Sequence, residues 1–578
     1  MTNVSPVSLR RPLALLAVLA TALAFMPARA GTPSAAGSCD WPRYGRNNGL
    51  SFSQPSSCTT LNTANAALMI PKWYLHAPES MSASTTVSDG IVYEGDWGGF
   101  FYAIDAATGK TLWTFKVDDT HQIGFGKIVS TAAVDTVRIP GVGPVKVVLF
   151  GGGGTLYALA AGRVGPKLLA KIDVDPRTPD YQAQQTKAGI DPEIEIESSP
   201  LVGHFADGDH VYVGFDVHNN AHVGRAGMLA FTLQKHTGLR VIAVNPSAPA
   251  SPTPPYEFNL EYKFDPERQV VLHSLTEGSG TGWGCGDVWS SPALQPTSNN
   301  DGILVFGTGN CDHPAESAKA GEVGREGIFA IDARTGEMVW PHPFQPRGVQ
   351  DLDDDFGASP NILDNGTAVG EGGKDGWYYK LDIKTGKEIW RAHGGQSGHV
   401  QTGFAIGGFI GTTAVGVANG KPAIFGAIAI STPIANTLDD PGGPTLDASL
   451  LTDPTRLFFL VAIDAQNGKI LWRSPFALPS YGAVTYANGV VLMADTVTFS
   501  LNAYDAGTGA LLAIRPIPGP PSSAPVIVGD SIYVAIGTSE TDLEFKAFSH
   551  DLENAFKDSI GQSPLSPLSG IFAFKLPL

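Results

Sequence analysis

Four short stretches hold the residues best suited to bind a metal or a cofactor. They read GWGCGDVWSS from Gly282, GTGNCDHP from Gly307, QDLDDDFGASP from Gln350 and GEGGKDGW from Gly370. Asn310 and Asp355 offer oxygen atoms, which are the ligands that Ca²⁺ prefers. Trp289 offers an indole face for a flat aromatic group, and Lys374 offers a cation for an anionic edge. Together these residue types predict a site for a planar, anionic cofactor held on a metal ion.

Two of these assignments have alternatives. Most acidic loops are solvated, and we assign Asp351, Asp353 and Asp354 to that class. Asp355 directly precedes Phe356 and a predicted inner strand, so we expect it to point inward. A lone lysine is also usually solvated. Lys374 lies in a glycine-rich link that can approach a ligand closely, and both interpretations of Lys374 stay open.

A repeated phrase supplies the scaffold for these side chains. It reads FYAIDAATGKTLW from Phe101, IFAIDARTGEMVW from Ile328, YYKLDIKTGKEIW from Tyr378 and LVAIDAQNGKILW from Leu460. The alternation of apolar residues predicts a half-buried strand, and the turn glycine fits a hairpin position with positive φ. Each copy is therefore a predicted β-hairpin. We expect the tryptophans of these hairpins to pack between neighbouring repeats: Trp113, Trp340, Trp390 and Trp472.

A second pair of strands precedes each hairpin, as in SSPAL and ILVFGTG from Ser290. The four-stranded unit starts at Ser84, Ser130, Ser198, Ser290, Ala358, Gly411, Gly482 and Ser522. Repetition of such units predicts an all-β fold, an eight-bladed β-propeller. The last unit lacks its fourth strand, and the segment 71–74 (PKWY) is expected to complete it. Pairing of the N- and C-terminal strands, with Trp73 near Phe572, would close the ring.

The cysteines of the chain are expected to form disulfides. An even number of cysteines (4) in an exported chain favours pairing. A hairpin that turns at residues 297–299 would place Cys285 opposite Cys311, at the edge of the predicted site. Free buried thiols are the alternative for these two residues. Cys39 and Cys58 form the second expected pair.

The start of the sequence predicts export. Arg10 and Arg11 precede an apolar run, and Ala28-Arg29-Ala30 resembles a cleavage site. We therefore assign residues 1–30 to a signal peptide and residues 31–578 to a single propeller domain, in a periplasmic or secreted protein. The apolar run is too short to span a bilayer, and no later segment predicts a membrane span. The net charge of −17 argues against a nucleic-acid partner.

The motifs GTGN, DFGASP and GGKDGWYY, together with the repeated hairpins, resemble the quinoprotein alcohol dehydrogenases. That family uses pyrroloquinoline quinone (PQQ) and Ca²⁺, and the resemblance, closest to polyvinyl-alcohol-dehydrogenase-like members, covers residues 40–578. It implies that Asn310 and Asp355 bind Ca²⁺ and that Asp355 is also the catalytic base. It implies that Trp289 stacks beneath PQQ and that Lys374 contacts the quinone oxygens.

Three departures from the family pattern qualify these roles. The vicinal cysteine pair that covers the other face of PQQ is absent from the corresponding segment, 121–131 (HQIGFGKIVST). A Ca²⁺-binding glutamate is not evident, and Asp216 is its candidate substitute. No Cys-x-x-Cys-His haem motif occurs, so electrons would pass to a separate acceptor such as a soluble cytochrome c.

The resemblance implies an exported dehydrogenase acting on a small or polymeric alcohol. The alternative is a cofactor-free propeller that serves as a binding or assembly scaffold. A lyase or glycosidase is less well supported, because no paired carboxylates on separate strands stand out.

Overall fold

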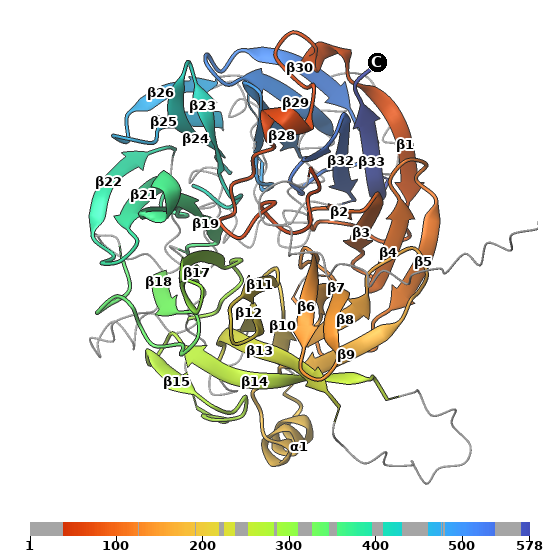
Figure 1. The fold of residues 1–578 in the computed structure, drawn as a ribbon, viewed down its shortest axis with the longest axis vertical. Coiled ribbons are helices and arrows are strands. Elements are labelled where there is room, and N and C mark those ends of the chain that lie inside the picture. Colours follow the sequence, from red (N-terminus) through yellow and green to blue (C-terminus); the bar gives the residue numbers. More distant parts are fainter. Residues whose placement is uncertain are drawn as a thin grey trace, which may run out of the picture. The chain divides into compact units, whose positions relative to one another are not determined.

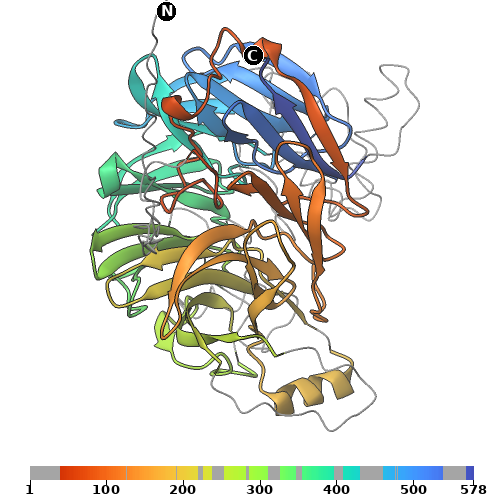
Figure 2. The same ribbon diagram turned by 45° about the vertical axis from the view of Figure 1, so that its right-hand side comes forward.

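The computed structural model describes residues 39–124, 126–190, 192–218, 225–236, 253–281, 286–309, 326–345, 355–395, 408–429, 460–474, 477, 480–496, 498–537 and 568–577. Cys39–Leu578 forms one compact unit. Its described residues form eight antiparallel sheets arranged as the blades of a ring (Figures 1 and 2). The predicted eight-bladed propeller is therefore confirmed, whereas the predicted signal peptide (residues 1–30) lies outside the described residues.

The blades are numbered here in chain order. Blade 1 contains β2 (Thr86–Ser88), β3 (Ile91–Gly95), β4 (Phe100–Asp105) and β5 (Thr111–Lys116). Blade 2 contains β6 (Ala133–Ile139), β7 (Gly143–Gly152), β8 (Thr155–Ala160) and β9 (Leu168–Asp173). Blade 3 contains β10 (Glu193–Glu195), β11 (Leu201–His204), β12 (Asp209–His218), β13 (Gly227–Lys235), β14 (Tyr256–Asp265) and β15 (Val270–Leu272). Blade 4 contains β16 (Ala293–Ser298), β17 (Asp301–Thr308) and β18 (Gly327–Asp332).

The second half of the ring is more regular. Blade 5 contains β19 (Ala358–Leu363), β20 (Ala368–Gly372), β21 (Trp377–Asp382) and β22 (Glu388–His393). Blade 6 contains β23 (Ala414–Ala418), β24 (Lys421–Ala427), β25 (Leu460–Asp464) and β26 (Ile470–Ser474). Blade 7 contains β27 (Thr485–Ala487), β28 (Val490–Asp495), β29 (Ser500–Asp505) and β30 (Leu511–Pro516). Blade 8 contains β31 (Val526–Val528), β32 (Ser531–Ile536), β33 (Gly570–Lys575) and β1 (Ile70–His76).

A few elements depart from the repeat. Blade 4 has bridges from Ile328 to Phe344 and from Ile331 to Met338 in place of a regular fourth strand. The helix α1 (Pro179–Ala188) lies between blades 2 and 3 in the chain. The remaining short 3-10 helices are η1 (Ser56–Cys58), η2 (Ala66–Leu68) and η3 (Asp364–Gly366). Among the described residues, none of the helices has the length and apolar character needed to cross a membrane.

Blade 8 closes the ring as predicted. The N-terminal strand β1 pairs with the C-terminal β33, with Tyr74 opposite Phe572 and Trp73 opposite Ala573. The side chain of Trp73 then reaches blade 1, where its Nε1 donates to the Ala106 carbonyl at 3.1 Å. The sheet edges that an open array would leave unpaired are thereby removed.

The hairpin tryptophans pack between blades, which confirms their predicted role. Trp340 of blade 4 donates to the carbonyl of Ile383 in blade 5 at 2.9 Å, and its indole lies against the turn glycine Gly386. Trp472 repeats this arrangement with Ala506 and Gly509 of blade 7. The turn glycine therefore serves two purposes, because it adopts positive φ and leaves room for the indole of the preceding blade.

A serine or threonine at the start of the inner strand links neighbouring blades from blade 1 to blade 5. Its backbone N–H donates to the hydroxyl of the equivalent residue in the next blade, at distances of 2.8–3.1 Å. The residues joined in this way are Ser84, Thr131, Ser199, Ser291 and Ser359. These hydrogen bonds explain why the sequence repeats a serine or threonine at the start of the inner strand. They also align the starts of the inner strands of neighbouring blades along the channel.

The segment 41–54 crosses the middle of the ring, as the red trace in Figure 1 shows, and it is hydrogen-bonded to all eight blades. Its hydrogen bonds reach Val87, Val134, Val202, Leu294, Ile362, Val415, Tyr486 and Ile527. Ile362 lies near the end of β19, whereas Asp355 precedes the start of that strand. The segment therefore covers the end of the channel opposite Asp355, about 20 Å away at the usual rise of a strand. The sequence patterns did not predict this feature.

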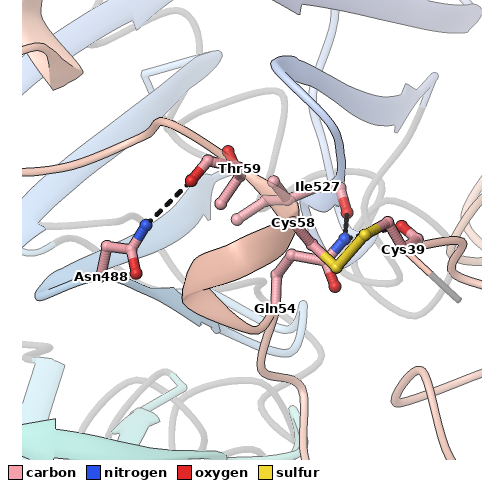
Figure 3. The surroundings of a disulfide bond; sticks show 6 residues. All are labelled: Cys39, Gln54, Cys58, Thr59, Asn488 and Ile527. Carbon is pink, nitrogen blue, oxygen red and sulfur yellow. Dashed lines mark hydrogen bonds between the residues drawn. A yellow bond between two sulfur atoms is a disulfide. The ribbon is translucent and has the colours of Figure 1, made fainter. Parts of the chain in front are cut away.

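A disulfide joins the two residues, Cys39 and Cys58, that flank this segment (Figure 3). Cys39 and Cys58 are bonded, as predicted. The side chain of Gln54 donates to the carbonyls of Cys39 at 2.8 Å and Ile527 at 2.9 Å, which ties the segment to blade 8 (Figure 3). The side-chain amide of Asn488 in blade 7 donates to the carbonyl of Thr59, next to Cys58, at 3.1 Å.

Candidate active site

Charged residues occupy the same place in four consecutive blades. They lie four positions before the Ser/Thr of the inner strand in blades 2 to 5: Lys127, Glu195, Asp287 and Asp355. The three carboxylates are buried, with exposed fractions of 1% or less. These four charges, from consecutive blades, lie on one arc of the ring, at the end of the channel opposite the segment 41–54.

An apolar residue anchors each of these charges. In blade 5, Phe356 packs against Gly307 of blade 4, where a Cβ would lie 2.7 Å from the Phe356 Cβ. Ile128, Ile196 and Val288 pack in the same way on glycines of the preceding blades. The Phe356 N–H also donates to the Thr308 carbonyl at 3.1 Å. Steric fit and a backbone hydrogen bond thus hold Asp355 where the chain enters the inner strand.

Asp355 and Lys374 form a buried ion pair. The Lys374 Nζ lies 2.7 Å from the Asp355 Oδ2, and the carboxylate is 0% exposed. The backbone of the two residues is joined as well, because the Lys374 N–H donates to the Asp355 carbonyl at 3.0 Å. Lys374 is therefore paired with a buried carboxylate rather than solvated, and its role in binding a cofactor stays a prediction.

Trp289 lies beside this ion pair. The Lys374 Nζ is 5.5 Å from the centre of the indole, a cation–π distance. A Cβ at Gly309 would come within 2.4 Å of the Asp355 Cγ and 2.7 Å of the Trp289 Nε1. Gly309 thus lies between the carboxylate and the indole, and it leaves both side chains in place because it has none. Three of the predicted site residues are brought together in this way.

Asp287 was not singled out in the sequence. Its backbone pairs with that of Gly309 through hydrogen bonds of 3.1 and 3.0 Å, and its Oδ1 accepts from the Val217 N–H at 3.3 Å. Asp216, which precedes Val217 in β12, is 0% exposed and lies opposite Glu195 in the β10–β12 pair. Asp216 is therefore at the acidic arc, and its role as a metal ligand stays a prediction.

Other predicted residues lie outside the described part of the chain. They are Asn310, Cys285, Cys311, Asp351, Asp353 and Asp354. The bridge between Asp287 and Gly309 has the register predicted for this hairpin, two positions inward from the two cysteines. Within the described residues, no group of three or more His, Cys, Asp or Glu side chains is arranged to hold a metal. The roles of Asn310, Asp355 and Asp216 as metal ligands stay predictions.

Glu371 is a second acidic residue that the sequence reasoning missed. Glu371 lies in β20 of blade 5. A Cβ at Gly307 of blade 4 would be 2.3 Å from the Glu371 Oε1. The Glu371 carboxyl therefore lies between blades 4 and 5, near Phe356. Burial raises the pKa of Glu371 well above its ordinary value. Burial therefore favours the protonated, uncharged form of this carboxyl. The sequence did contain a sign of Glu371. Glu94 lies in the second strand of blade 1, in YEGDW, at the position that Glu371 has in the second strand of blade 5.

The segment that lacks the family's cysteine pair is held by ionic contacts. His121 Nδ1 lies 2.9 Å from Asp119, and its Nε2 lies 3.4 Å from Asp175. Burial lowers the pKa of His121, but the hydrogen bonds to these carboxylates outweigh it and raise the pKa to about 10. The Lys127 Nζ donates to the His121 carbonyl at 2.7 Å. The segment thus presents a positively charged residue at the mouth rather than a sulfur pair.

The described residues fit a planar anionic ligand. The indole of Trp289 is a flat surface, and Lys374 supplies a positive charge directly over it. Asp355 supplies a hard oxygen ligand for a cation, and Gly309 and Gly357 leave the space that side chains would fill. Asp355, Lys374 and Trp289 are thus three of the residues that the sequence predicts for a PQQ site, and the Ca²⁺ ion stays a prediction.

The chain is similar in sequence to two kinds of known protein. Residues 455–551 match the family described as outer membrane protein assembly factor BamB. Lupanine 17-hydroxylase [cytochrome c] of Pseudomonas sp is 26% identical over 384 residues, which cover 62% of this chain and 48% of that protein. The dehydrogenase subunit of the quinone alcohol dehydrogenase of Komagataeibacter europaeus is 24% identical over 61% of this chain and 45% of its own length. The chain thus spans about half the length of these curated relatives.

Solved structures confirm the fold. The quinohemoprotein alcohol dehydrogenase ADHIIG from Pseudomonas putida HK5 matches with a TM-score of 0.60 and 17% identity, over 93% of this chain and 80% of that one. A europium-containing methanol dehydrogenase matches with a TM-score of 0.60 and 14% identity, over 93% and 98%. These structures show the fold, and the similarity to the quinone alcohol dehydrogenases in sequence comes from the curated relatives.

Proposed function

Because the chain is a relative of the quinoprotein alcohol dehydrogenases, we propose that it is a PQQ- and Ca²⁺-dependent dehydrogenase that oxidises an alcohol. The observation that carries the proposal is the convergence of Asp355, Lys374 and Trp289 at one channel mouth. These residues come from two blades, and the glycines between them leave room for close contact. A structural ion pair alone would not require an indole beside it.

Each residue has a role that its chemistry permits. Trp289 would support the flat face of the cofactor, and Lys374 would bind its anionic edge. Asp355, with Asn310 and Asp216, would hold the Ca²⁺ ion. PQQ, when bound, supplies the two-electron redox chemistry. Asp355 would accept the proton of the alcohol hydroxyl as a general base, and its burial keeps bulk water from competing for that proton.

We further propose that the protein is exported and acts in the periplasm or outside the cell. The Cys39–Cys58 disulfide supports an oxidising compartment. The electrons would pass to a separate acceptor such as a soluble cytochrome c. The name of the Pseudomonas relative includes cytochrome c, which supports an acceptor of this kind. The substrate would be a small or polymeric alcohol, primary or secondary.

A PQQ titration tests the proposed function. Tryptophan fluorescence should fall on addition of PQQ with Ca²⁺ present, and the loaded protein should reduce an artificial dye with a panel of primary, secondary and polymeric alcohols. Trp289→Ala should lose most of the affinity for PQQ, because stacking on the indole is removed. Absence of PQQ binding at micromolar concentration would overturn the proposal.

A cofactor-free scaffold is the second candidate. It is favoured by the match of residues 455–551 to the BamB family and by the segment 121–131, which has no cysteine. A scaffold predicts no PQQ binding and no dye reduction with any alcohol. The same titration therefore separates the two candidates.

A further inference from the structure

His121 connects two links of the chain at the mouth, the end of the channel where Asp355 lies. Its Nδ1 is 2.9 Å from the Asp119 Oδ2, and its Nε2 is 3.4 Å from the Asp175 Oδ2. Asp119 belongs to the link between blades 1 and 2, and Asp175 belongs to the link between blades 2 and 3 that contains α1 (the α1 link). Without a positively charged ring between them, the two carboxylates would repel each other.

Both carboxylates are held by further contacts. The Asp119 Oδ2 accepts from the Thr155 hydroxyl at 2.7 Å, and the Asp119 side chain is 1% exposed. The Asp175 Oδ2 accepts from the Arg177 guanidinium at 2.7 Å and from the side-chain amide of Gln182 in α1 at 3.1 Å. These contacts keep both carboxylates in place on the two sides of the imidazole.

The run of glycines 151–154 leaves room for this arrangement. Gly153 has φ of 60°, and a Cβ there would lie 2.1 Å from the Asp119 Oδ1. A Cβ at Gly154 would lie 3.0 Å from the His121 Nδ1. The turn between β7 and β8 therefore has space for the carboxylate and the imidazole only because these two residues have no side chain.

The residues that follow His121 are attached to blade 3. The Gln122 carbonyl accepts from the Ile194 N–H at 3.2 Å, and the Gly124 N–H donates to the Glu195 carboxylate at 3.3 Å. Movement of the segment 119–124 away from blade 3 would break both hydrogen bonds. The two N–H groups therefore report whether the segment is open or closed.

We propose that His121 is a positioning residue, a charged clamp that holds the segment 119–124 and the α1 link together at the mouth. Lys127 donates to the His121 carbonyl at 2.7 Å, and Glu195 accepts from the segment, so the clamp fixes two of the four charges on the arc that includes Asp355. A ligand bound at the mouth would leave more slowly while the clamp is closed. This last step rests on the proposed function, whereas the clamp itself does not.

The clamp should weaken as the pH rises, because it depends on the proton of His121. Burial lowers the pKa of His121, but hydrogen bonds to Asp119 and Asp175 raise it to about 10. An imidazole released into water has its ordinary pKa of about 6.5. The stabilisation is therefore complete below about pH 6.5 and is lost as the pH rises through about 10.

The neighbouring charged groups leave His121 as the source of this dependence. Burial raises the pKa values of Asp119 and Asp175, but hydrogen bonds, those from His121 included, bring them below the ordinary value. Carboxyl groups ordinarily titrate below pH 7, and lysine and arginine side chains titrate above pH 9. The charged residues that face His121 or the segment are Asp119, Lys127, Asp173, Asp175, Arg177, Glu193 and Glu195.

Hydrogen–deuterium exchange of the full chain without ligand tests the clamp. Between pH 7 and 9, after correction for the intrinsic exchange rate, protection of the Gly124 and Ile194 amides should fall about tenfold per pH unit, because opening releases one proton. This slope is measured on wild type, so a folding defect in a variant cannot obscure it. Protection that stays constant over this range would overturn the inference.

Substitutions assign the slope to His121. His121→Gln removes the charge, so protection at pH 7 should be about tenfold lower or less and should not vary with pH. His121→Arg keeps the charge and should retain the protection seen at pH 7 up to pH 9. His204→Gln is the matched control and should keep the wild-type slope, because His204 also lies between two aspartates but ends β11 at the other end of the channel. A slope that persists in His121→Gln would overturn the inference.

Release of PQQ tests the effect on a ligand. PQQ should leave His121→Gln about tenfold faster than wild type at pH 7, because such changes act mainly on dissociation, and His121→Arg should match wild type. Equal release rates from His121→Gln and wild type would overturn the ligand-retaining step. If wild type shows the slope but binds no PQQ, the clamp stands and the dehydrogenase proposal fails. If wild type binds PQQ and oxidises alcohols without the slope, the dehydrogenase proposal stands and the clamp fails.

Discussion

Gly357 lies against the indole of Trp289 so closely that no larger residue fits. A Cβ at position 357 would be 1.5 Å from the Cη2 of the indole. Gly357 directly follows Asp355 and Phe356, so the carboxylate and the indole are fitted to each other across two blades. Any side chain at position 357 must move Trp289 away from the ion pair of Asp355 and Lys374.

We therefore expect Gly357→Ala to lower PQQ affinity by more than about tenfold, since a displaced indole loses its stacking contact. Quenching of tryptophan fluorescence on titration with PQQ measures the loss. Gly208→Ala is the control, because a Cβ there meets nothing within 4 Å. Equal PQQ affinity in the two variants would contradict the assigned position of the indole.

Asp355→Asn should slow turnover about 10²–10⁴-fold, the usual effect of losing a positioned base. The substitution keeps the shape of the side chain and one oxygen ligand but removes the charge. Steady-state dye reduction by the PQQ-loaded protein measures the effect. Asp353→Asn, at a position expected to be solvated, should retain wild-type turnover. An Asp355→Asn variant as active as wild type would show that another group is the base.

The repeat made the ring predictable from the sequence. Each hairpin phrase contains a strand, a turn glycine and a tryptophan, and the observed contact of Trp340 with Gly386 explains why these residues recur together. Asp355, Lys374 and Trp289 could be found in the same way, because each lies where the repeat is interrupted near the end of a strand. Asp287 and Glu195 were missed. Both lie four positions before the Ser/Thr of the inner strand, and this shared position is recognised only when the blades are aligned with one another.

The channel-closing segment was beyond prediction for a different physical reason. Residues 41–54 have no period of alternation, and their hydrogen bonds go to all eight blades rather than to one partner strand. Such non-local contacts leave no pattern in the segment itself. Cys39 and Cys58 gave the one local sign that its two ends lie together.

Gly386→Ala should destabilise the protein more than Gly420→Ala. Both glycines have positive φ, 67° and 78°, so both substitutions carry backbone strain of about 1 kcal/mol. At Gly386 a Cβ would also lie 2.6 Å from the indole of Trp340, whereas at Gly420 it meets nothing within 4 Å. We expect an extra loss of about 1–3 kcal/mol from overpacking at Gly386. Denaturant unfolding measures both variants, and equal losses would contradict the indole contact.

His204 should make stability depend on pH in the alkaline range. Its ring lies between Asp135 at 3.1 Å and Asp209 at 3.0 Å, and hydrogen bonds to these carboxylates raise its pKa to about 9. Because the folded state binds this proton more tightly than the unfolded state, the contribution is complete below about pH 6.5. It is lost as the pH rises through about 9.

After allowance for solvent screening, we expect this loss to be about 1–2 kcal/mol. His204→Gln should lack this part of the pH dependence in denaturant unfolding between pH 6 and 10. A variant that follows the wild-type curve throughout would exclude His204 as its source.

Reduction of the Cys39–Cys58 disulfide should loosen the segment that closes the channel. The bond spans 19 positions, and a loop of this size contributes about 3 kcal/mol in the chain-entropy model. We expect the double variant Cys39→Ser/Cys58→Ser to melt at a lower temperature and to be cleaved faster by protease within residues 41–54. Peptide mapping of the cleavage products locates the site.

The contacts of residues 41–54 with the blades remain when the disulfide is absent, so the loss of stability is limited. The side chains of Trp41 and Phe52 are fully buried, and the hydrogen bonds to the blades do not depend on the disulfide. The double variant should therefore remain folded at 25 °C and keep its PQQ affinity, because Asp355 and Trp289 lie at the other end of the channel. Loss of PQQ affinity in a folded double variant would show that the two ends of the channel are coupled, contrary to this expectation.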